Sequence, residues 1–138
     1  MSMVVREFKS IGELVKFIDE EVNSYRALLA EFLRRLEDVR VRSEQEKKLK
    51  DLLKTLGVAE TKKSTVIDLK DSKLIIDPTA EEESKVIEEA VERLNKNIQV
   101  LQTIRKSLEP LANLDIEAKI TVVLRDGVPT SVLIKLSS

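Results

Sequence analysis

Hydrophobic residues between positions 11 and 41 recur at alternating spacings of three and four residues. This seven-residue repeat forms the seam of a coiled coil, and it predicts one helix over 11–41, about 45 Å long. The seam contains Ile11, Val15, Ile18, Val22, Tyr25, Leu29, Phe32, Leu36 and Val39. Further apolar residues beside it indicate that this helix contacts more than one other element: Leu14, Phe17, Leu28 and Leu33.

A serine three positions before a glutamate predicts where a helix begins, because each side chain satisfies a free backbone N–H of the other residue. Ser10 with Glu13 marks the start of the first helix. Ser43 with Glu46 predicts a break and a second, shorter helix over 44–56. Its apolar stripe is Leu49, Leu52, Leu53 and Leu56, and Gly57 follows at the C-terminal cap position.

A third helix is predicted over 79–108. Thr79 with Glu82 repeats the capping pattern, Pro78 suits the first turn, and Glu109-Pro110 ends the helix. Apolar residues again follow the three–four spacing, at Ile87, Val91, Leu94, Ile98 and Leu101. Because its length matches that of the first helix, we expect the two to lie against each other, within one chain or across a dimer. An antiparallel pair within one chain is the first choice, since the first hairpin can turn the chain back.

Strands are predicted where apolar residues alternate or cluster around turn residues, in two hairpins over 65–76 and 116–136. In the first hairpin, a two-residue loop of Asp71-Ser72 pairs Leu69 with Leu74.

The loop of the second hairpin is chosen by register. A two-residue Asp126-Gly127 loop would divide the apolar residues between both faces of the hairpin. A three-residue loop, Arg125-Asp126-Gly127, pairs Leu124 with Val128 and keeps those residues on one face, so we expect this loop.

Hairpins with a single apolar face are too small to stand alone, so we expect the two to share a four-stranded antiparallel sheet covered by helices. The pattern therefore predicts a single α+β domain over 1–138. It combines two long heptad-patterned helices, one shorter helix and the four-stranded sheet.

The composition narrows the chemistry. The 138 residues include no Cys, no His, no Trp and only three Gly. These absences exclude thiolate nucleophiles, His-based triads and the usual zinc ligands, and three glycines are too few for a phosphate-cradling loop. Paired carboxylates such as Glu88 and Glu92 fit a solvated helix face. We therefore predict no enzymatic activity, no metal site and no cofactor.

Targeting signals are also missing from the pattern. No apolar run approaches the roughly 20 residues of a membrane span, and no signal-peptide core is present. Abundant, balanced charges with few amides are typical of thermophile proteins. We expect a cytoplasmic protein that does not contact a membrane.

Charge is unevenly distributed, although the net charge is only -1. Residues 34–63 contain ten bases and six acids, which indicates either a solvated helix face or a patch for a polyanion. Single-strand binding also needs aromatic rings for base stacking, and Phe8 and Phe17 lie off the helix seam. The candidate nucleic-acid-binding residues are Arg34, Arg35, Arg40, Arg42, Lys47, Lys48, Lys62, Lys63, Phe8 and Phe17.

The element order from Ser10 to Leu136, with the thermophile-like composition, resembles the archaeal ThermoDBP-type single-stranded nucleic-acid-binding proteins. In that family, helices flank a four-stranded antiparallel sheet, and a cleft binds single strands. The resemblance implies an oligomer that binds single-stranded DNA or RNA without sequence preference. The chain ends in a strand and has no C-terminal zipper helix, and no family binding residue is carried over.

Long heptad helices beside a hairpin also resemble prefoldin-type chaperone subunits. There the hairpins lie between two terminal helices, whereas here the second hairpin follows the last helix. The alternative prediction is therefore a coiled-coil assembly or scaffold protein with a protein partner. Both alternatives predict self-association through the heptad helices.

Overall fold

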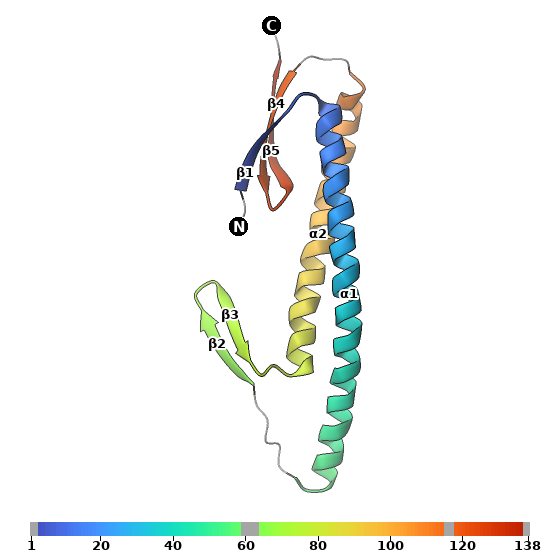
Figure 1. The fold of residues 1–138 in the computed structure, drawn as a ribbon, viewed down its shortest axis with the longest axis vertical. Coiled ribbons are helices and arrows are strands. Elements are labelled where there is room, and N and C mark those ends of the chain that lie inside the picture. The colour runs from blue at the N-terminus through green and yellow to red at the C-terminus, as the bar shows by residue number, and fades with distance from the viewer. Residues whose placement is uncertain (1–2, 59–63, 115–117, 137–138) are drawn as a thin grey trace. The chain divides into compact units, whose positions relative to one another are not determined.

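The computed structural model describes residues 3–58, 64–114 and 118–136. Over these residues the chain forms two helices and five strands, of the α+β class (Figure 1). Their order is β1 (Met3–Phe8), α1 (Ile11–Thr55), β2 (Thr65–Leu69), β3 (Ser72–Ile76), α2 (Ala80–Ala112), β4 (Ala118–Arg125) and β5 (Val128–Leu136).

The predicted break between two N-terminal helices is wrong, because α1 continues through Ser43 to Thr55. The residues around Ser43 are mostly strong helix formers, so continuing the helix is favoured over ending it. The Glu46 carboxylate does not cap its own helix. It accepts a hydrogen bond of 3.1 Å from the backbone N–H of Ala80, at the start of α2.

The other two predicted helix starts are confirmed by their hydrogen bonds. Ser10 Oγ accepts from the Glu13 N–H at 3.1 Å. Thr79 and Glu82 bond each other reciprocally, at 3.1 Å and 3.0 Å. The predicted end of this helix at 108 is wrong, because Pro110 lies inside the last turn of α2. The helix ends at Ala112.

The predicted four-stranded sheet is also wrong. The strands form a three-stranded antiparallel sheet in the order β1-β4-β5 and a separate two-stranded sheet of β2 and β3. The sequence pattern missed β1, which pairs with β4 from Met3 opposite Arg125 to Phe8 opposite Ile120. The third strand of the larger sheet is thus β1 and not a strand of the first hairpin.

The first hairpin closes one residue earlier than predicted. Lys70-Asp71 forms the loop, so Leu69 lies opposite Ser72 and Ile67 opposite Leu74. Because strand side chains alternate between faces, Ile67, Leu69, Leu74 and Ile76 still share one face.

The three-residue loop predicted for the second hairpin is wrong. Asp126-Gly127 forms a two-residue loop with φ of 54° and 78°, as a type I′ turn requires. The register then shifts between Val123 and Leu124, at a bulge that contains Thr130, whose Oγ1 donates to the Val123 carbonyl oxygen at 3.2 Å. The bulge returns the apolar residues to one face of the hairpin. The prediction had placed them on one face by means of a three-residue loop.

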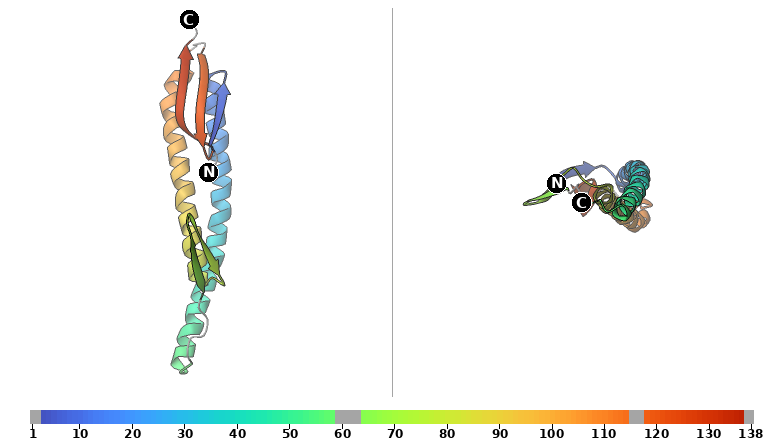
Figure 2. Two further views of the ribbon diagram at one scale, coloured as in Figure 1. Left: turned by 90° about the vertical axis from the view of Figure 1, so that its left-hand side faces the viewer. Right: turned by 90° about the horizontal axis from the view of Figure 1, so that it is seen from below.

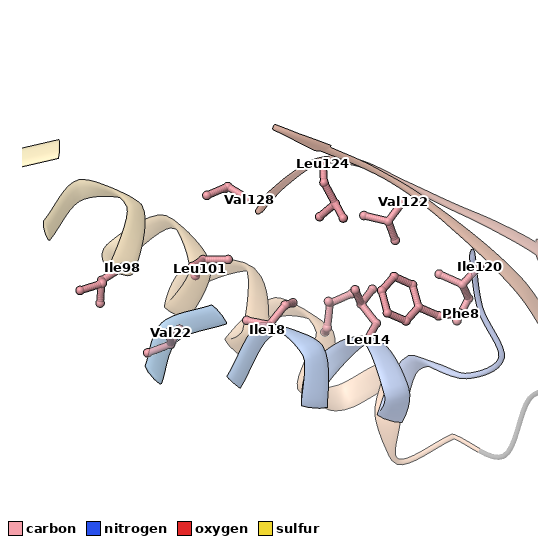
Figure 3. Packing of buried hydrophobic residues seen from close by; sticks show 11 residues of the cluster. Phe8, Leu14, Ile18, Val22, Ile98, Leu101, Ile120, Val122, Leu124 and Val128 are labelled. Atoms are coloured by element: carbon pink, nitrogen blue, oxygen red, sulfur yellow. The ribbon is translucent and has the colours of Figure 1, made fainter. Parts of the chain in front are cut away.

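The chain divides into two compact units, residues 1–29 with 93–138 and residues 30–92. The first unit contains β1, β4 and β5, which lie side by side over the segments of α1 and α2 in that unit (Figure 2). Its core is drawn from all of these elements (Figure 3) and includes Phe8, Leu14, Ile18, Val22, Ile98, Leu101, Ile120 and Val122. Asp19 accepts from Arg105 at 2.6 Å and 3.4 Å, and Tyr25, later in α1, accepts from Asn97, earlier in α2. The two helices therefore run antiparallel there.

The second unit contains the C-terminal part of α1, the β2–β3 hairpin and the start of α2. Its two helical segments also run antiparallel, since Arg40 pairs with Glu88 and Arg42 with Glu83. Among its described residues, few apolar side chains are buried: Leu36, Val39 and Ala80.

Candidate functional site

The predicted basic residues that the structure describes do not gather into one patch. The six that the structure describes are exposed on α1, at Arg34, Arg35, Arg40, Arg42, Lys47 and Lys48. Residues seven apart share a helix face, so Arg35 lies with Arg42, and Arg40 with Lys47, on different faces. Arg34 and Lys48 lie on a third face. Lys62 and Lys63 are outside the described residues.

Two of these guanidinium groups bond carboxylates of α2. Arg40 donates to Glu88 Oε1 at 3.1 Å, and Arg42 donates to Glu83 Oε2 at 2.9 Å. A phosphate would have to compete with these carboxylates. Both arginines therefore join the helices of the second unit.

A groove of about 490 Å³ in the second unit brings together Arg35 and Arg42. Its apolar floor includes Val39 of α1, Ile75 of β3 and Val86 of α2. Three carboxylates outnumber the two guanidinium groups along its walls: Asp38, Glu82 and Glu83. This balance of charge does not favour a polyanion.

The start of α2 is strongly acidic, with six carboxylates and one lysine between Ala80 and Glu92. Hydrogen bonds from Ser64 and from the Thr79 backbone hold the pKa of Glu82 below its usual value. This carboxylate therefore stays ionised at the helix N-terminus, where the helix dipole favours negative charge.

The two candidate aromatic residues meet in the first unit. The Phe8 and Phe17 rings lie 5.5 Å apart with a tilt of 53°, and Phe8 is buried in the core. The Arg6 guanidinium lies 5.3 Å from the Phe8 ring centre and 4.8 Å from that of Phe17. Because the two rings pack against each other and against Arg6, these contacts compete with the stacking of a nucleic-acid base on either ring.

The turn of the second hairpin is held against α1. Tyr25 OH donates to the Asp126 carbonyl oxygen and accepts from Asn97 Nδ2 at 3.4 Å. Burial raises the pKa of Tyr25, which keeps the hydroxyl protonated as a donor. Desolvation likewise raises the pKa of Glu21, whose carboxylate lies against Gly127. The hydrogen bonds of Tyr25 hold this turn against α1 and α2 within the first unit.

Sequence reasoning missed the surface that stands out most, the β2–β3 hairpin. Every residue of β2 is exposed, and in β3 only Ile75 is half-buried. Its exposed apolar side chains are 41% to 51% accessible: Val66, Ile67, Leu69, Leu74 and Ile76. Consecutive apolar residues, such as Leu74-Ile75-Ile76, put apolar groups on both faces, a signal present in the sequence.

A second exposed stripe lies at the C-terminal end of α1. Leu49, Leu52 and Leu56 are 56% to 67% accessible. The hydrogen bond between Glu46 and Ala80 puts the start of α2 beside Glu46, and α1 continues for nine residues beyond it. We call Leu49, Leu52 and Leu56 the tail stripe. Apolar residues at this spacing form a surface for another helix.

The described residues contain no group of three or more acidic side chains placed to hold a metal ion. Neither helix, over those residues, is long and apolar enough to cross a membrane.

No protein-family model, curated protein or solved structure matches the chain. The resemblance to ThermoDBP-type proteins stays a prediction.

Proposed function

We propose that this is a non-catalytic assembly protein of the cytoplasm that binds polypeptide chains through the β2–β3 hairpin and the tail stripe. The observation that carries the proposal is the exposure of apolar side chains on a two-stranded hairpin, whose strands have five residues each. Soluble monomers rarely expose large contiguous apolar surfaces, and those that do use them for binding.

The hairpin also lacks what it needs to be stable alone. A two-stranded hairpin is marginal in water and requires further strands or a packed face. The half-buried Ile75 supplies only one such contact to the groove. Binding a polypeptide would bury the remaining apolar residues and would order both partners at once.

A hairpin variant tests the proposal. Ile67→Lys with Leu74→Glu removes two apolar side chains that lie directly opposite each other, and the new opposite charges keep the cross-strand pair favourable. Fluorescence anisotropy of the labelled chain is measured against unlabelled chain and against a reduced, carboxymethylated polypeptide that cannot fold. We expect the wild type to bind at least one of them, and the variant to lose at least tenfold in affinity.

The matched control is Leu133→Lys, at an exposed leucine of β5 in the first unit. It makes the same kind of change, and we expect it to leave binding intact. If the wild type binds neither probe, or if the control weakens binding as much as the hairpin variant does, the proposal is wrong.

Single-strand binding is the second candidate, and one observation favours it. Arg34 and Lys48 are exposed on one face of α1, with no carboxylate of α2 bonded to them in the described residues. At 14 residues apart they lie about 21 Å from each other along the helix. Such a row would contact phosphates of a strand laid along α1, as the ThermoDBP-type resemblance implies.

An oligonucleotide titration at low and high salt tests this candidate. Arg34→Glu with Lys48→Glu reverses the exposed charges and leaves the pairs of Arg40 and Arg42 intact. Phosphate binding predicts affinity that falls steeply with salt and falls again in this variant. Equal affinity in variant and wild type, or no binding at low salt, would remove nucleic acid as a ligand.

A further inference from the structure

We propose that β2 pairs antiparallel with β2 of a second copy of the chain, with Ile67 opposite Ile67 of the second copy. The two hairpins then form one continuous four-stranded sheet. This inference rests on the proposed function and names the first polypeptide that the hairpin binds.

The free edge of the hairpin is the reason to expect strand pairing. In an antiparallel ladder, alternate residues direct their backbone groups to opposite sides of the strand. Leu69 and Ser72 close the two-residue loop, so Val66 and Asp68 direct their N–H and C=O groups away from β3. A second strand of matching register would satisfy these groups.

The edge of β2 is more open to pairing than the edge of β3. Proteins protect edge strands with lysine or proline. Lys73 lies within β3, whereas β2 contains neither residue. Ile75 of β3 also lines the groove beside the helices of its own unit. The β2 edge carries no such contact among the described residues.

The sequence of β2 is self-complementary around Ile67. In the proposed register, Val66 lies opposite Asp68 of the second copy, and Thr65 lies opposite Leu69. No like charges face each other directly. Residues opposite each other share a face, so the apolar face of one hairpin continues into that of the second copy and doubles its area.

Charge favours a second copy over a nucleic acid at this edge. The hairpin contains no aromatic residue for base stacking, and α2 begins with its acidic segment four residues after β3. A polyanion would be repelled there. The β2 strand of a second copy has one charged residue, Asp68, which this register keeps away from its counterpart.

The absence of cysteine from the chain makes crosslinking a direct test. Ile67 lies on the two-fold axis as a pair without backbone hydrogen bonds, a geometry whose Cα separation of about 4.5 Å suits a disulfide. We expect Ile67→Cys to form a covalent dimer under mild oxidation. Leu69→Cys is the matched control, since the two copies of residue 69 would lie about 13 Å apart and should not crosslink.

A second variant keeps Ile67 in place. Thr65→Cys with Leu69→Cys puts cysteines opposite each other between copies, while the two within one chain are too far apart to bond. We expect this variant to crosslink as well, and its helical circular dichroism should equal that of the wild type. Crosslinking of both variants without crosslinking of the control supports the pairing.

Leu74→Cys reports on the β3 edge. If it crosslinks and Ile67→Cys does not, the pairing through β2 is overturned, while the proposed function stands. If no variant crosslinks but the chain binds the carboxymethylated polypeptide, the second copy is overturned as the partner. If the chain binds neither itself nor that polypeptide, both proposals fall.

Discussion

At the scale of single residues, the turn of the second hairpin depends on one glycine. Gly127 has a φ of 78°, and a Cβ added to it would lie 2.3 Å from Glu21 Oε2. The turn needs glycine for its backbone conformation, whereas the atom nearest to that Cβ is the end of the flexible Glu21 side chain, which can move away. The Tyr25 hydroxyl fixes the same turn through the Asp126 carbonyl oxygen.

Gly127→Ala should lower the free energy of unfolding by about 1 kcal/mol through backbone strain, with a smaller further cost for moving the Glu21 carboxylate. Urea unfolding followed by circular dichroism measures the change. In a Glu21→Ala background the same substitution should cost only the backbone part, because the carboxylate is gone.

Gly57 offers the matched control. Its φ is 76°, and an added Cβ would meet nothing within 4 Å. Gly57→Ala should therefore cost about 1 kcal/mol, the backbone part alone. An equal loss at both glycines would show that the contact with Glu21 contributes nothing.

The pKa of Glu21 gives a pH-dependent prediction. Desolvation raises this pKa above its ordinary value of 4.5, against a smaller attraction to Arg6. Between the unfolded and folded pKa values the folded protein binds more protons, so stability falls as pH rises through that range. Glu21→Gln should therefore raise the melting temperature at neutral pH, and the gain should vanish below pH 4.5. A gain that persists in acid would exclude this cause.

At the scale of elements, the central finding is that α1 is one helix of 45 residues. Its two serine–glutamate pairs look alike in sequence, yet only Ser10 accepts a capping hydrogen bond. Ser43 lies in mid-helix, where a side chain oxygen has no free N–H to satisfy.

Two alanine substitutions separate these roles. Ser10→Ala should destabilise the protein by about 1 kcal/mol, because an N-cap is lost. Ser43→Ala should be neutral or stabilise by a few tenths of a kcal/mol, since alanine has the higher helix propensity. Thermal unfolding measures both. A loss at Ser43 equal to that at Ser10 would indicate a helix start at this position.

The sequence predicted the helices better than it predicted the pairing and register of the strands. Heptad spacing located both long helices, and the capping pairs at Ser10 and Thr79 located their starts. The register of the second hairpin was missed because the bulge at Thr130 has no local signal. It arises because the turn and the apolar face demand different registers. β1 was missed because its pairing partner, β4, is over a hundred residues away.

The contacts of the predicted basic residues could not be derived from the sequence. Charge along the sequence shows where cations are, but not which carboxylates fold against them, as Glu83 and Glu88 do against Arg42 and Arg40. The apolar pattern of the first hairpin predicts a covered sheet, because an apolar strand looks the same in sequence whether or not another element covers it.

At the scale of the whole molecule, charge and apolar surface make opposite predictions about association. Binding of a polyanion to basic residues weakens as the salt concentration rises, because salt ions screen the attraction and compete for the charged groups. Association through exposed leucine and isoleucine does not depend on charge and is maintained or strengthened as salt rises. Salt dependence therefore identifies which surface the protein uses.

Sedimentation velocity over a range of concentrations, at low and at high salt, is the most direct measurement of association through the apolar hairpin. The apolar hairpin predicts concentration-dependent association of the wild type at both salt levels, with no loss at high salt. The Ile67→Lys and Leu74→Glu hairpin variant should sediment as a monomer throughout. A wild type that is monomeric at every concentration would exclude a second copy as the partner of the hairpin. A variant that associates as strongly as the wild type would show that the hairpin is not the surface through which the copies associate.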